Sequence, residues 1–292
     1  MVQLGTVPPI VTEIEAETTD RFGNVLPTII VKPDEPEINW KSYDYADAFL
    51  SKMTSPTTAD EIDIHQLTAD LTSIGALSKF IWLAPYIGGN AADHSLNLCY
   101  PYAKGGNKIR FVGSAVHNSD GVQGGTGVYA KNDLCLSQLN PEDFSMGLYS
   151  LDSALTSVAV MEMGFGKDYG DFVGIYLGNN SYFGSSPFFS TRNYGNKVAF
   201  SLTDASGQFD YVMNGSRRAV ARNGSIIATS STFVGWYEIA NDNLTFLSYL
   251  GDGTGNARRI AMHYVGEHFS DTEIADNYAA FQAFQTSRGR EV

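Results

Sequence analysis

From about residue 94 onward, the sequence is a series of short β-branched and aromatic runs separated by Gly, Asn, Asp and Ser. Five such runs span residues 108–112, 157–163, 172–177, 197–202 and 258–265. Between 219–222 and 225–228 lies Asn223-Gly224, the pair that a two-residue type I′ hairpin requires. No helical pattern interleaves these runs, and 29 glycines with 12% aromatic residues also favour strands joined by tight turns. The sequence therefore predicts a mainly β fold, an antiparallel two-sheet jelly-roll sandwich.

Residues 1–40 have a different texture. Apolar and acidic side chains alternate over 7–17, and Pro27, Pro33 and Pro36 then exclude a helix or a central strand. We expect an extended N-terminal docking arm that lies on a partner or on a neighbouring copy. The alternative is an arm folded back on its own domain.

Residues 41–90 show a helical period before the sandwich begins. Ile64, Leu67, Leu71 and Ile74 recur at spacings of three and four, and Gly75 ends the pattern. Thr58 followed by Glu61 fits a capping box at the start. We expect a short helical collar in this segment.

The last segment, 91–292, is expected to be the sandwich closed by a C-terminal helix. Ser270 and Glu273 form a capping box, and Phe269 with Ile274 can form a hydrophobic staple. An apolar row that can pack on the sandwich follows, and it consists of Ile274, Tyr278, Phe281 and Phe284. Gly289 ends the helix.

The charge balance argues against nucleic acid as a partner. With 19 Lys and Arg against 32 Asp and Glu, the formal net charge is −13, the wrong sign for neutralising phosphates. No apolar stretch of about 18 residues is present, and the N-terminus lacks the plan of a secretion signal. We expect a soluble chain, made in a cytoplasm, without membrane insertion.

One short motif resembles an enzyme. Residues 61–65, Glu-Ile-Asp-Ile-His, look like the core of laminarinase-type glycosidases, in which the motif lies on a strand and its carboxylates share one cleft. Here the motif falls in a helical pattern, where residues two apart point about 200° apart. We interpret the match as a coincidence, with Glu61 as a cap residue. No nucleophile elbow or phosphate loop appears, and we predict no enzymatic activity and no catalytic residues.

The sequence offers little for a metal or a cofactor. The two cysteines, Cys99 and Cys135, are expected to be buried small apolar residues, and the five histidines are scattered. Asp252 and Asn256 could give oxygens to a calcium ion, but a plain glycine-rich hairpin is the alternative for that loop. We expect no metal and no cofactor.

Residues 178–197 resemble a recognition surface. They mix aromatic residues with Asn, Ser and Gly, as binding loops do, because rings stack on sugars or proteins and small polar groups fix orientation. The candidate ligand-binding residues for a glycan or a partner are Tyr182, Phe183, Phe188, Phe189, Arg192, Tyr194 and Trp236. The alternative is a long inter-strand loop whose aromatic residues cover the edge of the sandwich.

Three segments resemble the concanavalin A-like (laminin G-like) structural proteins of tailed bacteriophage virions. Residues 67–80 are similar to the helix that precedes that family's domain, and 125–130 are similar to one of its turns. Residues 261–290, with Phe-Ser-Asp-Thr-Glu-Ile at 269–274, resemble its C-terminal ending. The resemblance covers about residues 43–290 and leaves out the arm. It implies a concanavalin A-like sandwich and a non-enzymatic virion protein present in many symmetric copies.

The leading hypothesis is therefore a virion structural protein of a tail, baseplate or capsid surface. It would dock through residues 1–40 and display the sandwich for assembly or host-surface contact. The expected partners are other virion proteins and copies of itself, in a virion assembled in the host cytoplasm. The alternative is a carbohydrate-binding module or receptor-binding protein that recognises a bacterial surface glycan. A glycosidase that uses Glu61 and Asp63 is the third hypothesis.

Overall fold

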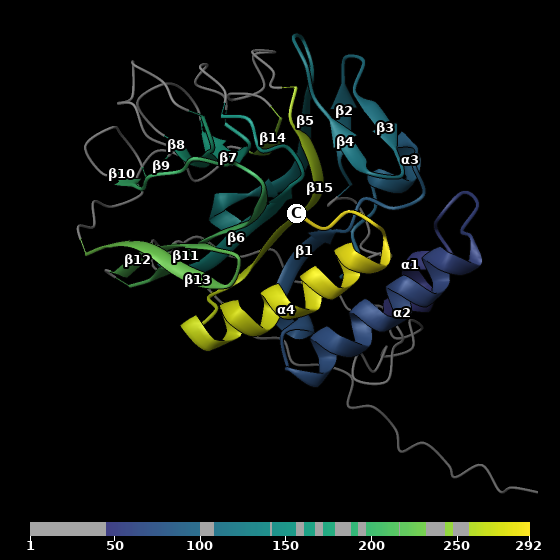
Figure 1. The fold of residues 1–292 in the computed structure, drawn as a ribbon, viewed down its shortest axis with the longest axis horizontal. Helices are drawn as coiled ribbons and strands as arrows, with labels where there is room; N and C mark the ends of the chain where they lie inside the picture. Colours follow the sequence, from purple (N-terminus) through teal and green to yellow (C-terminus); the bar gives the residue numbers. More distant parts are fainter. Residues whose placement is uncertain are drawn as a thin grey trace, which may run out of the picture. The chain divides into compact units, whose positions relative to one another are not determined.

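The predicted antiparallel sandwich is present in the computed structural model of the chain (Figure 1). The structure describes residues 45–99, 108–140, 142–155, 161–166, 172–178, 188–191, 197–215, 217–231, 243–247 and 257–292. The predicted docking arm, residues 1–40, lies outside the described residues. Residues 44–292 belong to one compact unit, and the fold below is that of this unit.

The described strands form two sheets, and every described pair of neighbours is antiparallel. The larger sheet runs in the order β13 (Ser225–Ser230), β12 (Arg217–Arg222), β11 (Gly207–Asn214), β6 (Asp143–Ser150), β15 (Arg259–Glu267), β4 (Gly121–Gln123) and β3 (Val116–Asn118). The smaller sheet runs in the order β10 (Lys197–Ala199), β9 (Phe188–Thr191), β8 (Phe172–Tyr176), β7 (Met163–Gly166), β14 (Asn243–Phe246), β5 (Tyr129–Cys135) and β2 (Arg110–Val112). This arrangement confirms the predicted fold class.

The first hydrophobic core fills the space between the sheets. Its large side chains include Phe144 and Leu148 from β6, Phe165 from β7 and Phe246 from β14, all at most 1% exposed. Because side chains alternate along a strand, the other residues of β6 face away from this core. Apart from Asp143 at its start, those residues are buried as well, so the larger sheet must be covered on both faces.

Helices form that second cover. The helices α1 (Tyr45–Leu50), α2 (Thr58–Ser73) and α4 (Asp271–Ser287) pack their apolar residues against the outer face of the larger sheet. In this second core, Tyr149 of β6 and Tyr264 of β15 meet side chains such as Ile64 of α2 and Phe281 of α4. Figure 1 shows α2 and α4 side by side below the sheets. The unit therefore has three layers.

Strand β1 (Phe80–Ala84) joins the helical segment to the larger sheet. It pairs with β15, with Trp82 opposite Val265 and Ala84 opposite His263. Phe80 faces the helical side, where its ring packs 5.2 Å from the ring centroid of Tyr264, while Trp82 faces the core between the sheets. A short helix, α3 (Ala91–His94), follows.

The helix starts are close to the predicted ones. The capping box of α4 is formed by Ser270 and Glu273 as predicted, and Gly289 follows the helix with φ of +66°. For α2 the prediction was wrong by one residue, because Thr57 is the N-cap and Asp60 completes the box. Asp60 is 3% exposed, so the carboxylate that completes the box lies in the interior, whereas the side chain of Glu61 is exposed to solvent.

The hairpin at Asn223-Gly224 is confirmed, with φ of +49° and +75° joining β12 to β13. The pairing then slips, because Ala221 is opposite Ile226 whereas Val220 is opposite Ala228. Ile227 is therefore the extra residue of a β-bulge and is 40% exposed. The bulge lets Ile226 pack on the helical side and Ala228 on the inter-sheet core.

The predicted strands agree with the structure in four of five cases. Runs 108–112, 172–177, 197–202 and 258–265 contain β2, β8, β10 and most of β15. The run at 157–163 is the exception, since 156–160 lie outside the described residues and β7 begins only at Met163.

Candidate functional site

The predicted recognition residues are only partly within the described chain. Tyr182, Phe183, Arg192, Tyr194 and Trp236 lie outside the described residues. Phe188 and Phe189 lie on strand β9 rather than in a loop. Phe189 pairs with Ile175 and Val198, two residues of the inter-sheet core. The predicted calcium ligands Asp252 and Asn256 also lie outside the described residues.

The described part of the smaller sheet carries a polar row on its outer face. In β5, Ala130 and Leu134 belong to the inter-sheet core, so the alternating residues Tyr129, Lys131 and Asp133 face outward. On the neighbouring strand β2, Arg110 pairs with Lys131. We call Arg110, Tyr129, Lys131 and Asp133 the β5 face.

Two contacts organise the β5 face. The Nζ atom of Lys131 lies 5.3 Å from the centroid of the Tyr129 ring, within the range of a cation–π interaction. A guanidinium nitrogen of Arg110 donates to Oδ1 of Asp133 at 2.6 Å. Both partners of this ion pair are open to water, with side chains 65% and 44% exposed. The face therefore offers an aromatic ring, two cations and one carboxylate to a ligand, in a chain of net charge −13.

Sequence reasoning missed the β5 face, although a signal for it exists. Residues 129–135 read Tyr-Ala-Lys-Asn-Asp-Leu-Cys, which alternates polar and apolar residues except at Asn132. Asn132 is fully buried, and its Oδ1 accepts a hydrogen bond from the backbone N–H of Leu134. That hydrogen bond gives the buried amide oxygen a partner. In the sequence, the polar residue at a core position interrupts the alternation that would indicate a strand.

The glycosidase motif does not form a cleft of carboxylates. Glu61 and Asp63 lie in the first half of α2, as the helical pattern predicts. Glu61 is exposed, whereas Asp63 is buried and accepts a hydrogen bond from Arg288 at 3.0 Å. Their two side chains therefore belong to opposite sides of the helix and to different environments.

The histidines are less scattered than predicted. The Nδ1 atoms of His94 and His117 are 3.0 Å apart, and the hydroxyl of Tyr86 is 2.8 Å from Nδ1 of His263. The Tyr86 ring lies 5.4 Å from that of His94, so four residues that are distant in sequence form one cluster. Arg290, from beyond the end of α4, donates to the backbone carbonyl of Tyr86 at 3.0 Å.

Burial keeps this cluster neutral. Loss of solvent lowers the pKa of His94 to about 3, helped by the neighbouring His117 and Arg290, and lowers the pKa of His263 to about 3. Burial also lowers the pKa of His117 and raises that of Tyr86. Tyr86, His94 and His263 are thus uncharged hydrogen-bonding groups of the interior, and His117 lies half-buried at their edge.

Of the two cysteines, only Cys99 is buried as predicted. Cys99 is 2% exposed and lies in the helical-side core, where burial raises the pKa of its thiol. Cys135 is half-buried, and its Sγ donates to Oδ1 of Asn243 at 3.1 Å. Among the described residues, no group of three His, Cys, Asp or Glu side chains is placed to hold a metal ion. None of the described helices is long and apolar enough to cross a membrane.

Taken together, the two antiparallel sheets and their strand order define a jelly-roll β-sandwich. No protein-family profile matches the sequence, and no curated protein is a significant relative. Among solved structures, the chain is similar to one described under "cell entry of botulinum neurotoxin type C is dependent upon interaction with two ganglioside molecules". The TM-score is 0.51 at 14% identity, over 72% of this chain and 53% of that chain.

Two further similarities are weaker. Domain 4 of an extracellular GH43 arabinanase from Geobacillus stearothermophilus, in complex with arabinotriose, gives a TM-score of 0.48 at 10% identity, over 68% of this chain and 98% of that one. The binding domain of botulinum neurotoxin DC, in complex with rat synaptotagmin II, gives 0.47 at 14% identity, over 70% and 52%. At such identities the type C toxin similarity establishes a shared fold alone, and the chain spans about half of the toxin structures.

Proposed function

We propose that this protein is a non-enzymatic binding protein that recognises a glycan with the outer side of its smaller sheet. The observation that carries the proposal is the β5 face, in which Tyr129, Lys131 and Asp133 alternate outward beside Arg110. The type C toxin structure that shares the fold is described as interacting with two gangliosides, which supports a glycan as the ligand class.

The chemistry of the β5 face suits a sugar. An aromatic ring stacks on the apolar face of a pyranose, and charged side chains donate to and accept from its hydroxyl groups. The Arg110–Asp133 pair presents both kinds of group within one hydrogen-bonded unit. Lys131 and Arg110 together outweigh Asp133 in charge, so a sugar that bears a carboxylate is favoured over a neutral one.

A glycan array probed with the full chain tests the proposal. We expect binding to acidic glycans that weakens at least about tenfold on Tyr129→Ala and survives Tyr129→Phe, because the phenyl ring keeps the stacking surface. The double change Arg110→Ala with Lys131→Ala should remove the preference for acidic over neutral glycans. Tyr278→Ala, a change on α4 far from this face, is the matched control.

Two outcomes would contradict this site. Binding that survives both Tyr129→Ala and the double change rules out the β5 face, as does a chain that binds no glycan at all. If binding instead falls only when aromatic residues of 178–197 or Trp236 are replaced, the glycan site is the one predicted from sequence.

A second proposal is a structural protein of a bacteriophage virion. Two of the segments that resemble that family, residues 67–80 and 261–290, contain parts of α2, β1, β15 and α4. These elements pack together, with β1 paired to β15 and with apolar residues of both helices in one core. The resemblance thus concerns one contiguous region of the fold, and this contiguity is what supports the second proposal.

Deletion of residues 1–35 tests this second proposal. The docking role of the arm requires that the shortened protein fail to enter virus particles while it still folds. Incorporation at normal occupancy would contradict docking through the arm, and the glycan array would then decide between the two functions independently.

A further inference from the structure

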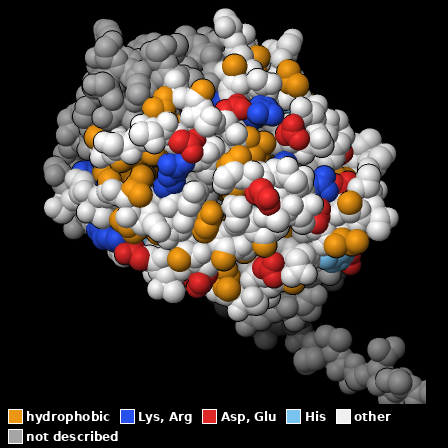
Figure 2. Space-filling view, viewed as in Figure 1, with side chains coloured by type: hydrophobic (Ala, Val, Ile, Leu, Met, Phe, Trp, Pro, Cys, Tyr) orange, Lys and Arg blue, Asp and Glu red, His pale blue; other side chains and the backbone are white. Residues whose placement is uncertain are grey.

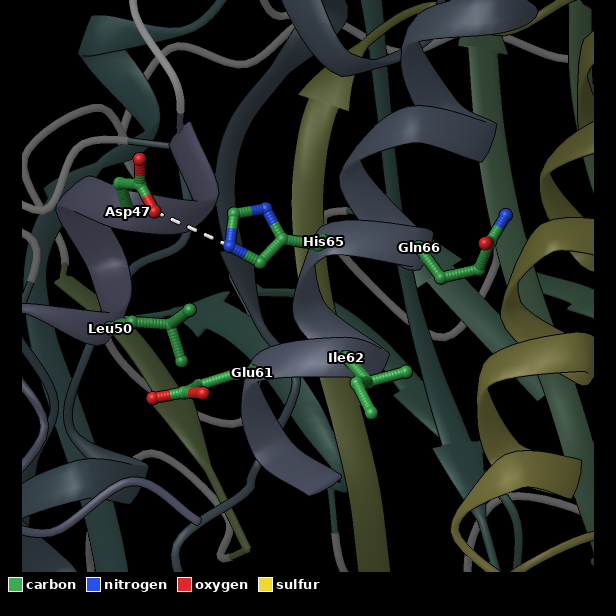
Figure 3. A pocket seen from close by; sticks show the side chains of 6 residues that line it. All are labelled: Asp47, Leu50, Glu61, Ile62, His65 and Gln66. Carbon is green, nitrogen blue, oxygen red and sulfur yellow. Dashed lines mark ion pairs between the residues drawn. The ribbon is translucent and has the colours of Figure 1, made fainter. Parts of the chain in front are cut away.

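A groove between α1 and α2 plays no part in either of the two proposed functions. It is an open groove with a volume of about 650 Å³, and it is lined by Asp47, Leu50, Glu61, Ile62, His65 and Gln66 (Figure 3). Asp47 points from α1 toward His65 on α2, with Oδ1 and Nε2 3.3 Å apart. Figure 2 shows hydrophobic and acidic side chains beside a histidine over these two helices.

Ile62 gives the groove an apolar anchor. The core-facing row of α2, which includes Ile64 and Leu67, is at most 1% exposed, whereas Ile62 is 63% exposed. This is the highest exposure of any large hydrophobic side chain in the described parts of the chain. A lone exposed isoleucine is ordinary, but here it forms the wall of a groove together with Leu50.

The charge of α2 is one-sided. The helix carries Asp60, Glu61, Asp63 and Asp70 and has no Lys or Arg. Asp60 and Asp63 face inward and both pair with Arg288, at 2.9 and 3.0 Å. Glu61 faces the groove, and no cation of the described residues pairs with it. The groove is therefore an apolar surface with surplus negative charge.

We propose that the α1–α2 groove docks a basic amphipathic segment of a partner protein. An apolar side chain of the segment would cover Ile62 and Leu50, and a Lys or Arg would pair with Glu61. Glu61, Ile62 and Leu50 line the same groove, so one segment can meet the carboxylate and the apolar side chains together. The open rim suits a peptide better than a small ligand.

A peptide of known composition can test this surface without knowledge of the natural partner. The probe is a fluorescein-labelled amphipathic helix of Lys and Leu, and the comparison peptide has Glu in place of every Lys. Fluorescence anisotropy with the full chain should show binding of the Lys–Leu peptide and none of the Glu–Leu peptide. Ile62→Glu and Glu61→Lys should each raise Kd at least about tenfold.

Two matched controls separate the groove from diffuse attraction to an acidic protein. Ile227→Glu changes another exposed isoleucine, at the β13 bulge, and Asp276→Lys reverses an exposed charge on α4. Both should leave Kd within about twofold of the unchanged protein. Equal loss in all four variants, or no loss in Ile62→Glu and Glu61→Lys, would overturn the proposal. Thermal melts of each variant show whether the fold is intact.

Discussion

The buried Asp210 and the buried histidines His94 and His263 change the free energy of unfolding with pH in opposite directions. Asp210 of β11 is 1% exposed beneath α4, where Gln208 donates to its Oδ1 at 2.7 Å and the hydroxyl of Tyr264 donates to the same oxygen. Burial raises the pKa of Asp210 to about 7, against the hydrogen bonds, which lower it. Tyr264 can reach Asp210 because Gly147 leaves its ring space, since a Cβ there would lie 2.5 Å from the ring.

These pKa values predict a stability that rises with pH between about 4 and 6.5. In that window His94 and His263 are neutral when folded but protonated when unfolded, and each contributes about 1.4 kcal/mol per pH unit in favour of higher pH. Asp210 contributes the opposite sign, because it is protonated when folded and ionised when unfolded. His117, whose pKa burial also lowers, adds to the histidine contribution, so the net slope is at least about 1.4 kcal/mol per pH unit, measurable from urea unfolding at several pH values.

Asp210→Asn isolates the opposing contribution. The amide does not titrate, so the slope should roughly double in this variant while the histidines continue to act. A slope unchanged from that of the native protein would mean that Asp210 is ionised in the folded state. A profile that falls with pH in the unchanged protein and is flat in Asp210→Asn would mean that the histidines are protonated inside the fold.

At the scale of elements, Arg288 connects the two long helices of the outer layer. It follows α4 and pairs with Asp60 and Asp63 of α2, whose side chains are 4% and 11% exposed. Because these carboxylates are shielded from water, the loss of their shared cation leaves two charges uncompensated.

Arg288→Ala is expected to lower the free energy of unfolding by about 3 kcal/mol and to increase hydrogen exchange in α2. Arg217→Ala is the matched control, since Arg217 pairs with Asp271 at 2.8 Å but both side chains are 40% or more exposed. That exposed pair should contribute less than about 1 kcal/mol. Equal losses in the two variants would show that the buried carboxylates are stabilised by something other than Arg288.

Elements with a strong local signal could be predicted from sequence. The caps and apolar row of α4, the Asn223-Gly224 turn and the period of α2 all depend on residues within one or two turns. The cluster of Tyr86, His94 and His263 could not, because its members meet only through long-range pairing of β1 with β15. The β5 face was missed because a buried Asn132 interrupts an otherwise readable alternation.

For the molecule as a whole, one buried ion pair ties the two sheets together. Arg258, just before β15 in the larger sheet, donates from Nε to Oε1 of Glu162 at 3.0 Å, and Glu162 precedes β7 in the smaller sheet. Both side chains are at most 1% exposed. Arg258 also donates to the backbone carbonyls of Asp152 and Ala154, so it fixes the connection after β6 too.

Arg258→Met is expected to cost about 3–5 kcal/mol, because it leaves Glu162 charged in the interior. Adding Glu162→Met should recover part of that loss, since a buried pair exchanged for apolar residues is often nearly neutral. Urea unfolding of the two single variants and the double variant gives the comparison. A double variant less stable than Arg258→Met alone would show that the pair stabilises the fold beyond charge compensation.

The pairing of β1 with β15 also limits when the chain can fold during translation, because β1 has no partner strand until β15 has been synthesised. At about 5–20 residues per second, β15 is synthesised roughly ten to forty seconds after β1. Throughout that interval the apolar rows of α1 and α2 have no finished sheet to cover. The nascent chain therefore exposes the apolar rows of these helices while the sandwich is incomplete, and we expect its yield in cells to rise when chaperones that bind apolar segments are abundant.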